Sequence, residues 1–170
     1  MDAAAHYRTL IALGRDEFLA AAAPAAFVRY RPDRAGTNTF DSTMTIDEDS
    51  MDETLPHGAF SVTDIGLELY PLAKKPGASF PDRITIGRTS NNDISIVDHS
   101  VSRLHAYVRQ QAGGWVVADA GSKNGSWLRG EALEARRERP LTSRNVLRVG
   151  DVDLTFYSAA DLFSVLGGGE

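Results

Sequence analysis

The chain has 170 residues, of which 42% are hydrophobic and 24% are charged, a balance typical of a soluble domain with some additional segments. Its formal net charge of −5 disfavours a nucleic-acid partner, because binding to a phosphate backbone needs a basic surface. The chain has no cysteine, and its four histidines lack metal-ligand spacing, so we expect neither a metal nor a cofactor. Because no apolar run is long enough to span a bilayer or to act as a signal segment, we expect a cytoplasmic protein without membrane contacts.

Residues 1–32 have a helical pattern and form the first expected segment. Four large side chains recur on one face with a 3.6-residue period: Tyr7, Leu10, Ile11 and Phe18. Gly14 is expected to divide the segment into two helices, and Pro24 to end the second one. The alternation in residues 27–30 indicates a short strand. We expect this segment to serve in packing or docking.

Residues 33–60 differ in composition from the rest of the chain. They are rich in Thr, Ser, Asp and Glu and contain few large apolar residues. Such a stretch cannot bury enough apolar surface to offset the entropy lost on ordering, which predicts a flexible linker. The segment holds five candidate phosphorylation sites: Thr37, Thr39, Thr43, Thr45 and Thr54.

Residues 61–158 alternate between apolar and polar positions and contain frequent Gly and Asn turns. Strand-like runs occur at residues 65–70, 84–87, 94–96, 104–108, 115–118, 126–128, 146–149 and 152–156. Many short strands at close spacing predict an all-β domain, either an antiparallel sandwich or a barrel. Residues 159–170 are expected to form a short C-terminal helix, capped by Ser158, and a Gly-rich tail.

Three loop motifs lie between strand-like runs in this region: Gly87-Arg88, Ser102-Arg103-Leu104-His105 and Ser122-Lys123-Asn124-Gly125. A phosphate group carries about −1.5 to −2 charges at neutral pH and has three acceptor oxygens, so it needs converging cationic and hydroxyl donors. The residues expected to converge on one phosphate are Arg88, Ser102, Arg103, Lys123 and Asn124. The Asn124 amide both donates and accepts, which suits a peptide backbone better than a phosphate.

These motifs, together with Asn92-Asp93-Ile94, Trp115, Asp119 and Trp127, resemble the forkhead-associated (FHA) domain of bacterial type. The resemblance covers residues 61–158 and implies a two-sheet antiparallel β-sandwich of the SMAD/FHA type. It also implies that the loops at one end of the sandwich bind phosphothreonine peptides. Lys123 departs from the family pattern, because many members have a small polar residue at this position.

Two further groups of residues have expected roles beside the phosphate. Structural support is expected from Gly87, His105 and Gly125, through a close backbone approach, a buried ring and a tight turn. Residues expected to contact the peptide beside the phosphothreonine are His99, Ser100 and Asn92. For His99 and Ser100 the resemblance implies selection of the third residue after the phosphothreonine.

The sequence therefore predicts a phosphothreonine-peptide-binding module in Ser/Thr kinase signalling, not an enzyme. Its ligand is either a phosphorylated protein or its own phosphorylated linker, which would then block external partners. One alternative is an assembly scaffold whose sandwich binds no phosphate. A catalytic alternative would use Ser102 with His105 as a base and Asp98 or Asp119 as the orienting acid. The serine lacks a nucleophile-elbow sequence, which disfavours catalysis.

Overall fold

The structure is a computed structural model of the chain, and it describes residues 3–30, 67–78 and 80–166. The expected linker at residues 33–60, with its five threonines, lies outside these residues. No helix within the described ranges is long and apolar enough to cross a membrane.

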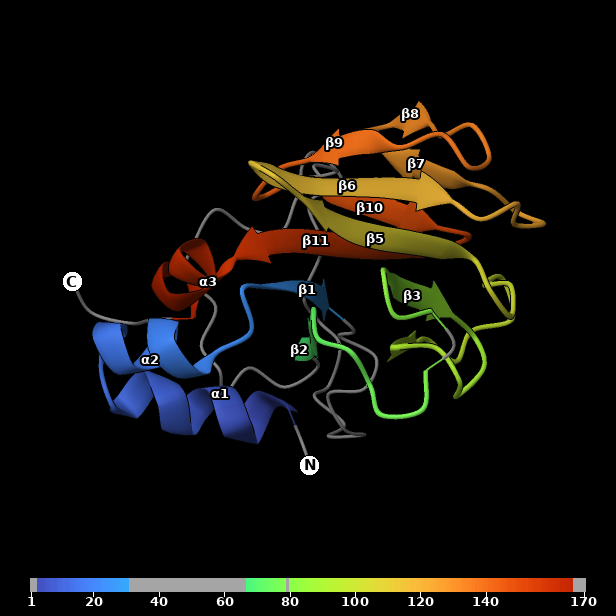
Figure 1. The fold of residues 1–170 in the computed structure, drawn as a ribbon. Coiled ribbons are helices and arrows are strands. Elements are labelled where there is room, and N and C mark those ends of the chain that lie inside the picture. The colour runs from blue at the N-terminus through green and yellow to red at the C-terminus, as the bar shows by residue number, and fades with distance from the viewer. Residues whose placement is uncertain (1–2, 31–66, 79, 167–170) are drawn as a thin grey trace, which may run out of the picture.

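Two sheets form the sandwich, and Figure 1 shows them packed face to face. The six-stranded sheet has the order β2-β1-β11-β10-β7-β8 and contains β1 (Ala25–Tyr30), β2 (Leu67–Pro71), β7 (Ser126–Leu128), β8 (Glu131–Ala132), β10 (Val146–Val149) and β11 (Val152–Ser158). The five-stranded sheet has the order β4-β3-β5-β6-β9 and contains β3 (Ile84–Gly87), β4 (Ile94–Ser95), β5 (Ala106–Gln111), β6 (Gly114–Asp119) and β9 (Arg139–Leu141). The predicted two-sheet sandwich is confirmed.

One strand pair departs from the antiparallel expectation. β3 and β4 run parallel, with Ile86 opposite Ile94, whereas the other strand pairs of the two sheets are antiparallel. The strands β8 and β9 were not predicted. They are short and largely polar on their exposed faces, so they lack the apolar alternation that marks a strand in sequence.

The main core lies between the two sheets and follows the period-two pattern of the strands. In β10, Leu147 and Val149 point into the core, whereas Val146 and Arg148 face outward. Phe27, Trp115 and Phe156 join the sheets through edge-to-face ring contacts, with ring centroids 5.6 Å and 6.2 Å from that of Phe156. This core holds the strand ends, and with them the connecting loops, in fixed positions.

Three short helices, α1 (Ala3–Ala12), α2 (Arg15–Ala21) and α3 (Ala159–Val165), pack together at one end of the sandwich (Figure 1). The predicted division at Gly14 is confirmed, and α2 ends before Pro24. A second apolar core forms here, in which the Phe18 ring lies 5.7 Å from Tyr7 and 5.2 Å from Phe163. The predicted cap is also confirmed, because the Ser158 hydroxyl accepts a hydrogen bond from the Asp161 N–H at 3.3 Å.

The strand predicted at residues 27–30 is confirmed as β1, but its place could not be read from the sequence. β1 pairs with both β2 and β11, so a strand from the N-terminal segment lies inside the six-stranded sheet. Figure 1 shows that β3 and β6 point away from the helices. The loops that follow these strands therefore lie at the end of the sandwich opposite the helices.

Candidate functional site

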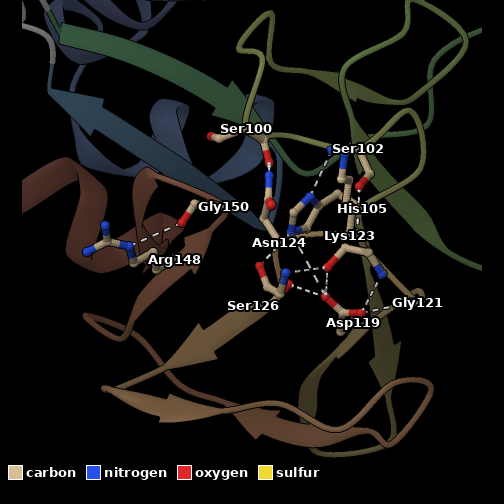
Figure 2. A network of polar contacts seen from close by, with 12 residues as sticks. Ser100, Ser102, His105, Asp119, Gly121, Lys123, Asn124, Ser126, Arg148 and Gly150 are labelled. Atoms are coloured by element: carbon tan, nitrogen blue, oxygen red, sulfur yellow. Dashed lines mark hydrogen bonds and ion pairs between the residues drawn. The ribbon is translucent and has the colours of Figure 1, made fainter.

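Three loops meet at this end of the sandwich and are joined through one serine. The N–H of Arg88, directly after β3, donates to the Ser102 carbonyl oxygen at 2.9 Å. The Lys123 N–H, from the loop after β6, donates to the Ser102 hydroxyl oxygen at 3.0 Å. In Figure 2, Lys123 lies beside Ser102, and Asn124 reaches Ser100, where its Nδ2 donates to the carbonyl oxygen at 2.8 Å. The loops that carry the five predicted phosphate and peptide contacts therefore come together.

The side chains at this junction leave cationic and hydroxyl donors available. Arg88, Arg103 and Lys123 are exposed, and none of them forms an ion pair with a carboxylate in the described part of the chain. The Ser102 hydroxyl accepts the Lys123 N–H, which leaves its own proton free to donate to a ligand. Such a set of donors favours an anionic ligand with several acceptor oxygens.

His105 ties two of the loops together from below. Its ring is fully buried, with 0% exposure. Nδ1 accepts the Ser102 N–H at 3.0 Å, so Nε2 must carry the proton that it shares with the Gly125 carbonyl oxygen at 2.8 Å. The neutral imidazole thus fixes the backbone of both loops.

The same contacts do not produce a catalytic serine–histidine pair. Both ring nitrogens of His105 bond to backbone groups, and neither bonds to the Ser102 hydroxyl. The nearest approach of Nε2 to the Asp119 carboxylate is 4.0 Å, which is too long for a hydrogen bond. Asp98 instead bonds to Ser100. The geometry therefore does not support the catalytic alternative.

Asp119, at the end of β6, holds the third loop in shape. Its Oδ1 accepts N–H groups of Gly121 and Ser122 at 2.8 Å, and its Oδ2 accepts the hydroxyls of Ser122 and Ser126 at 2.6 Å (Figure 2). Burial by itself would raise the pKa of Asp119, but the hydrogen bonds donated by Ser122, Ser126 and Gly121 lower it below its ordinary value. Asp119 is therefore ionised at neutral pH. This support role was not predicted, although an Asp before a Gly-Ser turn is a known turn signature.

Two glycines permit the close contacts between loops. A Cβ at Gly87 would collide with the Arg103 carbonyl oxygen and with the Asn92 amide, so any larger residue would push the second loop away. Gly125 has φ +87°, in the region that L-residues rarely adopt, and an added Cβ would lie 3.3 Å from the ring of Trp127. Both positions thus set the spacing of the loops.

The structure corrects the expected peptide contacts of two residues. Asn92 is only 3% exposed, and its Nδ2 donates to the carbonyl oxygens of Arg103 at 2.7 Å and Thr89 at 2.9 Å. Asn92 is buried because its side chain lies beneath the loop that carries Arg103 and holds that loop in place. The sequence suggested a surface turn because Asn-Asn-Asp is a common turn composition.

The second corrected residue is Ser100, which is buried, whereas the neighbouring His99 is exposed. Ser100 is 4% exposed; its hydroxyl donates to Asp98 at 2.7 Å and accepts the Asp151 N–H at 2.9 Å. This serine joins its loop to the β10–β11 turn, so its hydroxyl is not available to a peptide. The His99 side chain is 95% exposed and remains accessible at the rim of the site.

A two-sheet sandwich with exposed donors on converging loops defines a binding module built on loops at one end of a β-sandwich. Residues 84–150 match the FHA domain family. The chain is 35% identical over 108 residues to the oxoglutarate dehydrogenase inhibitor of Corynebacterium diphtheriae. The aligned residues make up 62% of this chain and 69% of that protein. The chain belongs to the FHA domain family.

Other similarities concern the domain alone. An FHA domain-containing protein of Arabidopsis thaliana is 33% identical over 78 residues, which are 45% of this chain and 19% of that protein. The structure of Mycobacterium tuberculosis EmbR in complex with a low-affinity phosphopeptide aligns with 55% of this chain and 22% of that one, at 28% identity and a TM-score of 0.47. The chain thus spans only about a fifth of each of these two larger proteins.

Proposed function

We propose that this protein binds phosphothreonine peptides in Ser/Thr kinase signalling. The observation that carries the proposal is the meeting of three loops around Ser102, with exposed cations that have no carboxylate partner in the described residues. Membership of the FHA family supports the same ligand, because the resemblance of the loop motifs to this family implies phosphothreonine recognition. The proposed setting is the cytoplasm, where ATP-dependent kinases act.

Each group has a role that follows from its chemistry. The Arg88 guanidinium offers a planar pair of donors to two phosphate oxygens, and Arg103 and Lys123 add further positive charge. The Ser102 hydroxyl donates to a third oxygen, and the hydrogen bond that it accepts from Lys123 leaves its own proton free to do so. Asn124 is held by Ser100, which leaves its Oδ1 and one N–H for the peptide backbone.

The magnitude of binding follows from these groups. Hydrogen bonds to charged groups contribute about 1.5–3 kcal/mol each, so three of them give about 5–9 kcal/mol before the costs of association. Micromolar affinity corresponds to about −8 kcal/mol, which therefore requires further contacts from the residues beside the phosphothreonine. We expect weak and reversible recognition.

The ligand is a phosphorylated partner or the chain's own linker. Residues 33–60 contain the candidate threonines and connect β1 to β2, two neighbouring strands. A tethered phosphothreonine has an effective concentration of about 1 mM, which exceeds a micromolar dissociation constant about a thousandfold. A phosphorylated linker would therefore compete with external partners.

Replacing Arg88 with alanine tests the proposal. We expect R88A to weaken binding to a phosphothreonine peptide about a hundredfold, since the charge-assisted hydrogen bonds of one guanidinium to the phosphate are lost. Arg8→Ala, on α1 at the opposite end of the sandwich, removes the same charge and should leave the affinity unchanged. Calorimetry with the phosphorylated and unphosphorylated peptide, and circular dichroism for the fold, would measure these effects.

The outcomes separate the proposal from the scaffold alternative. Equal affinity of the wild type for both peptides would favour a scaffold that binds no phosphate. An unchanged affinity in R88A would contradict the proposed site around Arg88. Autoregulation needs a separate measurement on the full chain, before and after treatment with a Ser/Thr kinase. If the kinase-treated chain binds the external peptide as tightly as the untreated chain, the linker does not compete.

A further inference from the structure

A groove adjoins the phosphate-binding loops on the outer face of the six-stranded sheet. It has a volume of about 970 Å³ and begins at His99, Ser100 and Asn124. From there it extends over β7 and β10 to Arg129. Because Asn124 belongs both to the third loop and to the groove wall, a peptide bound at the loops can continue into the groove without leaving the surface.

The register of the strands explains what lines the groove. Leu128 and Leu147 are opposite each other and buried, so their neighbours in sequence, Trp127 and Val146, face outward. Arg148, opposite Trp127, faces the same side, and Figure 2 shows its side chain extending away from the loop network. The helices cover the other part of this outer face, towards β1 and β2, and leave the β7–β10 part open. The lining therefore combines an apolar strip, Trp127 and Val146, with two arginines and with two aspartates, Asp151 and Asp153.

The two arginines of the groove differ in their partners. Arg148 lies 3.8 Å from the Asp151 carboxylate, and its Nε donates to the Gly150 carbonyl oxygen. Arg129 forms no ion pair with any residue that the structure describes. It lies at the far end of the groove, where its N–H donates to the Val146 carbonyl oxygen at 3.1 Å. The charge of Arg129 is therefore available to an anionic group of a ligand.

The backbone at Arg129 is a second, independent observation. Arg129 and Gly130 form the two-residue turn between β7 and β8, with φ +54° and +81°. Such turns require positive φ at both positions and favour Asn, Asp or Gly at the first. Three arginines of the described residues have positive φ, namely Arg129, Arg136 and Arg144, and Arg129 is the one of them that lines the groove.

We propose that this groove is a second recognition site for the phosphothreonine peptide, and that Arg129 binds an acidic side chain of that peptide. Trp127 and Val146 would contact the intervening apolar side chains. Extended chain spans about 3.3 Å per residue, so the five residues from Asn124 to Arg129 correspond to about 16 Å. The acidic residue should therefore lie about four to six positions from the phosphothreonine. This inference rests on the proposed function and names the peptide class that the same site would select.

The test uses phosphothreonine peptides with alanine at the flanking positions and one aspartate or lysine placed at each position in turn. With the full-length protein, we expect one position about four to six residues from the phosphothreonine at which aspartate binds about fivefold more tightly than lysine. Arg129→Asn should abolish this difference. Because Asn suits the turn, R129N should melt at the same temperature as the wild type or higher; Arg129→Gly serves as a second variant that suits the turn.

Arg136→Asn is the matched control. Arg136 also has positive φ, at +62°, and it lines a separate pocket of about 290 Å³ beside Leu104 and Tyr107. The R136N change removes the same charge from another position with positive φ, but outside the groove, so it should keep the preference for aspartate. Loss of the preference in R136N, its persistence in R129N, or its absence from the wild type would overturn the inference. If no phosphothreonine peptide bound at all, the proposed function itself would fail.

Discussion

The two ends of the sandwich are built from different kinds of contact. At the helical end, Tyr7, Phe18 and Phe163 pack into an apolar core. At the loop end, buried polar groups lie among the apolar ones, and His105 and Asp119 connect the loops through hydrogen bonds. Apolar contacts have no required direction, whereas each hydrogen bond needs one donor and one acceptor in place. The helical end thus contributes stability, and the loop end fixes the position of exposed donors.

This difference predicts separate effects of mutation. Changes at the helical end should alter the free energy of unfolding without altering ligand affinity. Changes to the buried polar groups at the loop end should alter both, because the same bonds hold the loops and present their side chains.

The largest effect is expected from Phe18→Ala at the helical end. Removing a fully buried ring leaves a cavity, and we expect the free energy of unfolding to fall by about 3–5 kcal/mol. Chemical denaturation would measure this loss. The affinity of the folded variant for a phosphothreonine peptide should equal that of the wild type, and a weaker affinity would show that the two ends are coupled.

Asp119→Asn should have the next largest effect, and it should act on both properties. The amide loses the charge and presents a donor to Ser122 and Ser126, so we expect a loss of about 2–4 kcal/mol in the free energy of unfolding. Peptide affinity should fall as well, because the loop that carries Lys123 is released. Asp82→Asn, which changes an exposed carboxylate just before β3, is the control and should change neither quantity appreciably.

The pH dependence of stability gives a smaller effect at the same residue. The pKa of Asp119 is lowered in the folded state, so its ionised form adds stability above the unfolded pKa of about 3.9. That stability is lost as the pH falls through the lower folded pKa. Acid unfolding of D119N should therefore show a shallower slope below about pH 4 than the wild type. Identical slopes would contradict the assigned pKa shift.

Ser158→Ala should have the smallest effect. The Ser158 hydroxyl caps α3, and loss of such a cap costs about 1 kcal/mol. Thermal unfolding should show a small decrease in the melting temperature, with no change in peptide affinity. Ser158→Asp, which retains a capping acceptor, should restore the wild-type stability.

Much of the fold was predictable because its signals are local. The alternation in β10 and β11, the break at Gly14 and the cap at Ser158 each depend on a few neighbouring residues. The three loop motifs were also identified from the sequence, because they combine turn residues with cationic and hydroxyl donors between strand-like runs. Their meeting at one end also required that β3 and β6 point the same way, which the structure shows.

The remainder depended on contacts between distant residues. Asn92 and Ser100 have the composition of surface turns, yet they are buried because other loops pack over them. The parallel pair β3–β4 and the short strands β8 and β9 arise from pairing partners, which carry no apolar alternation.

The sequence by itself determined most of the strands, the break between the first two helices and the donor chemistry of the loops, since these follow from periodicity and residue type. Only the tertiary structure decided which polar residues face a ligand and which support the loops. The same is true of the groove that ends at Arg129, because burial and pairing are set by the packing of segments far apart in the chain.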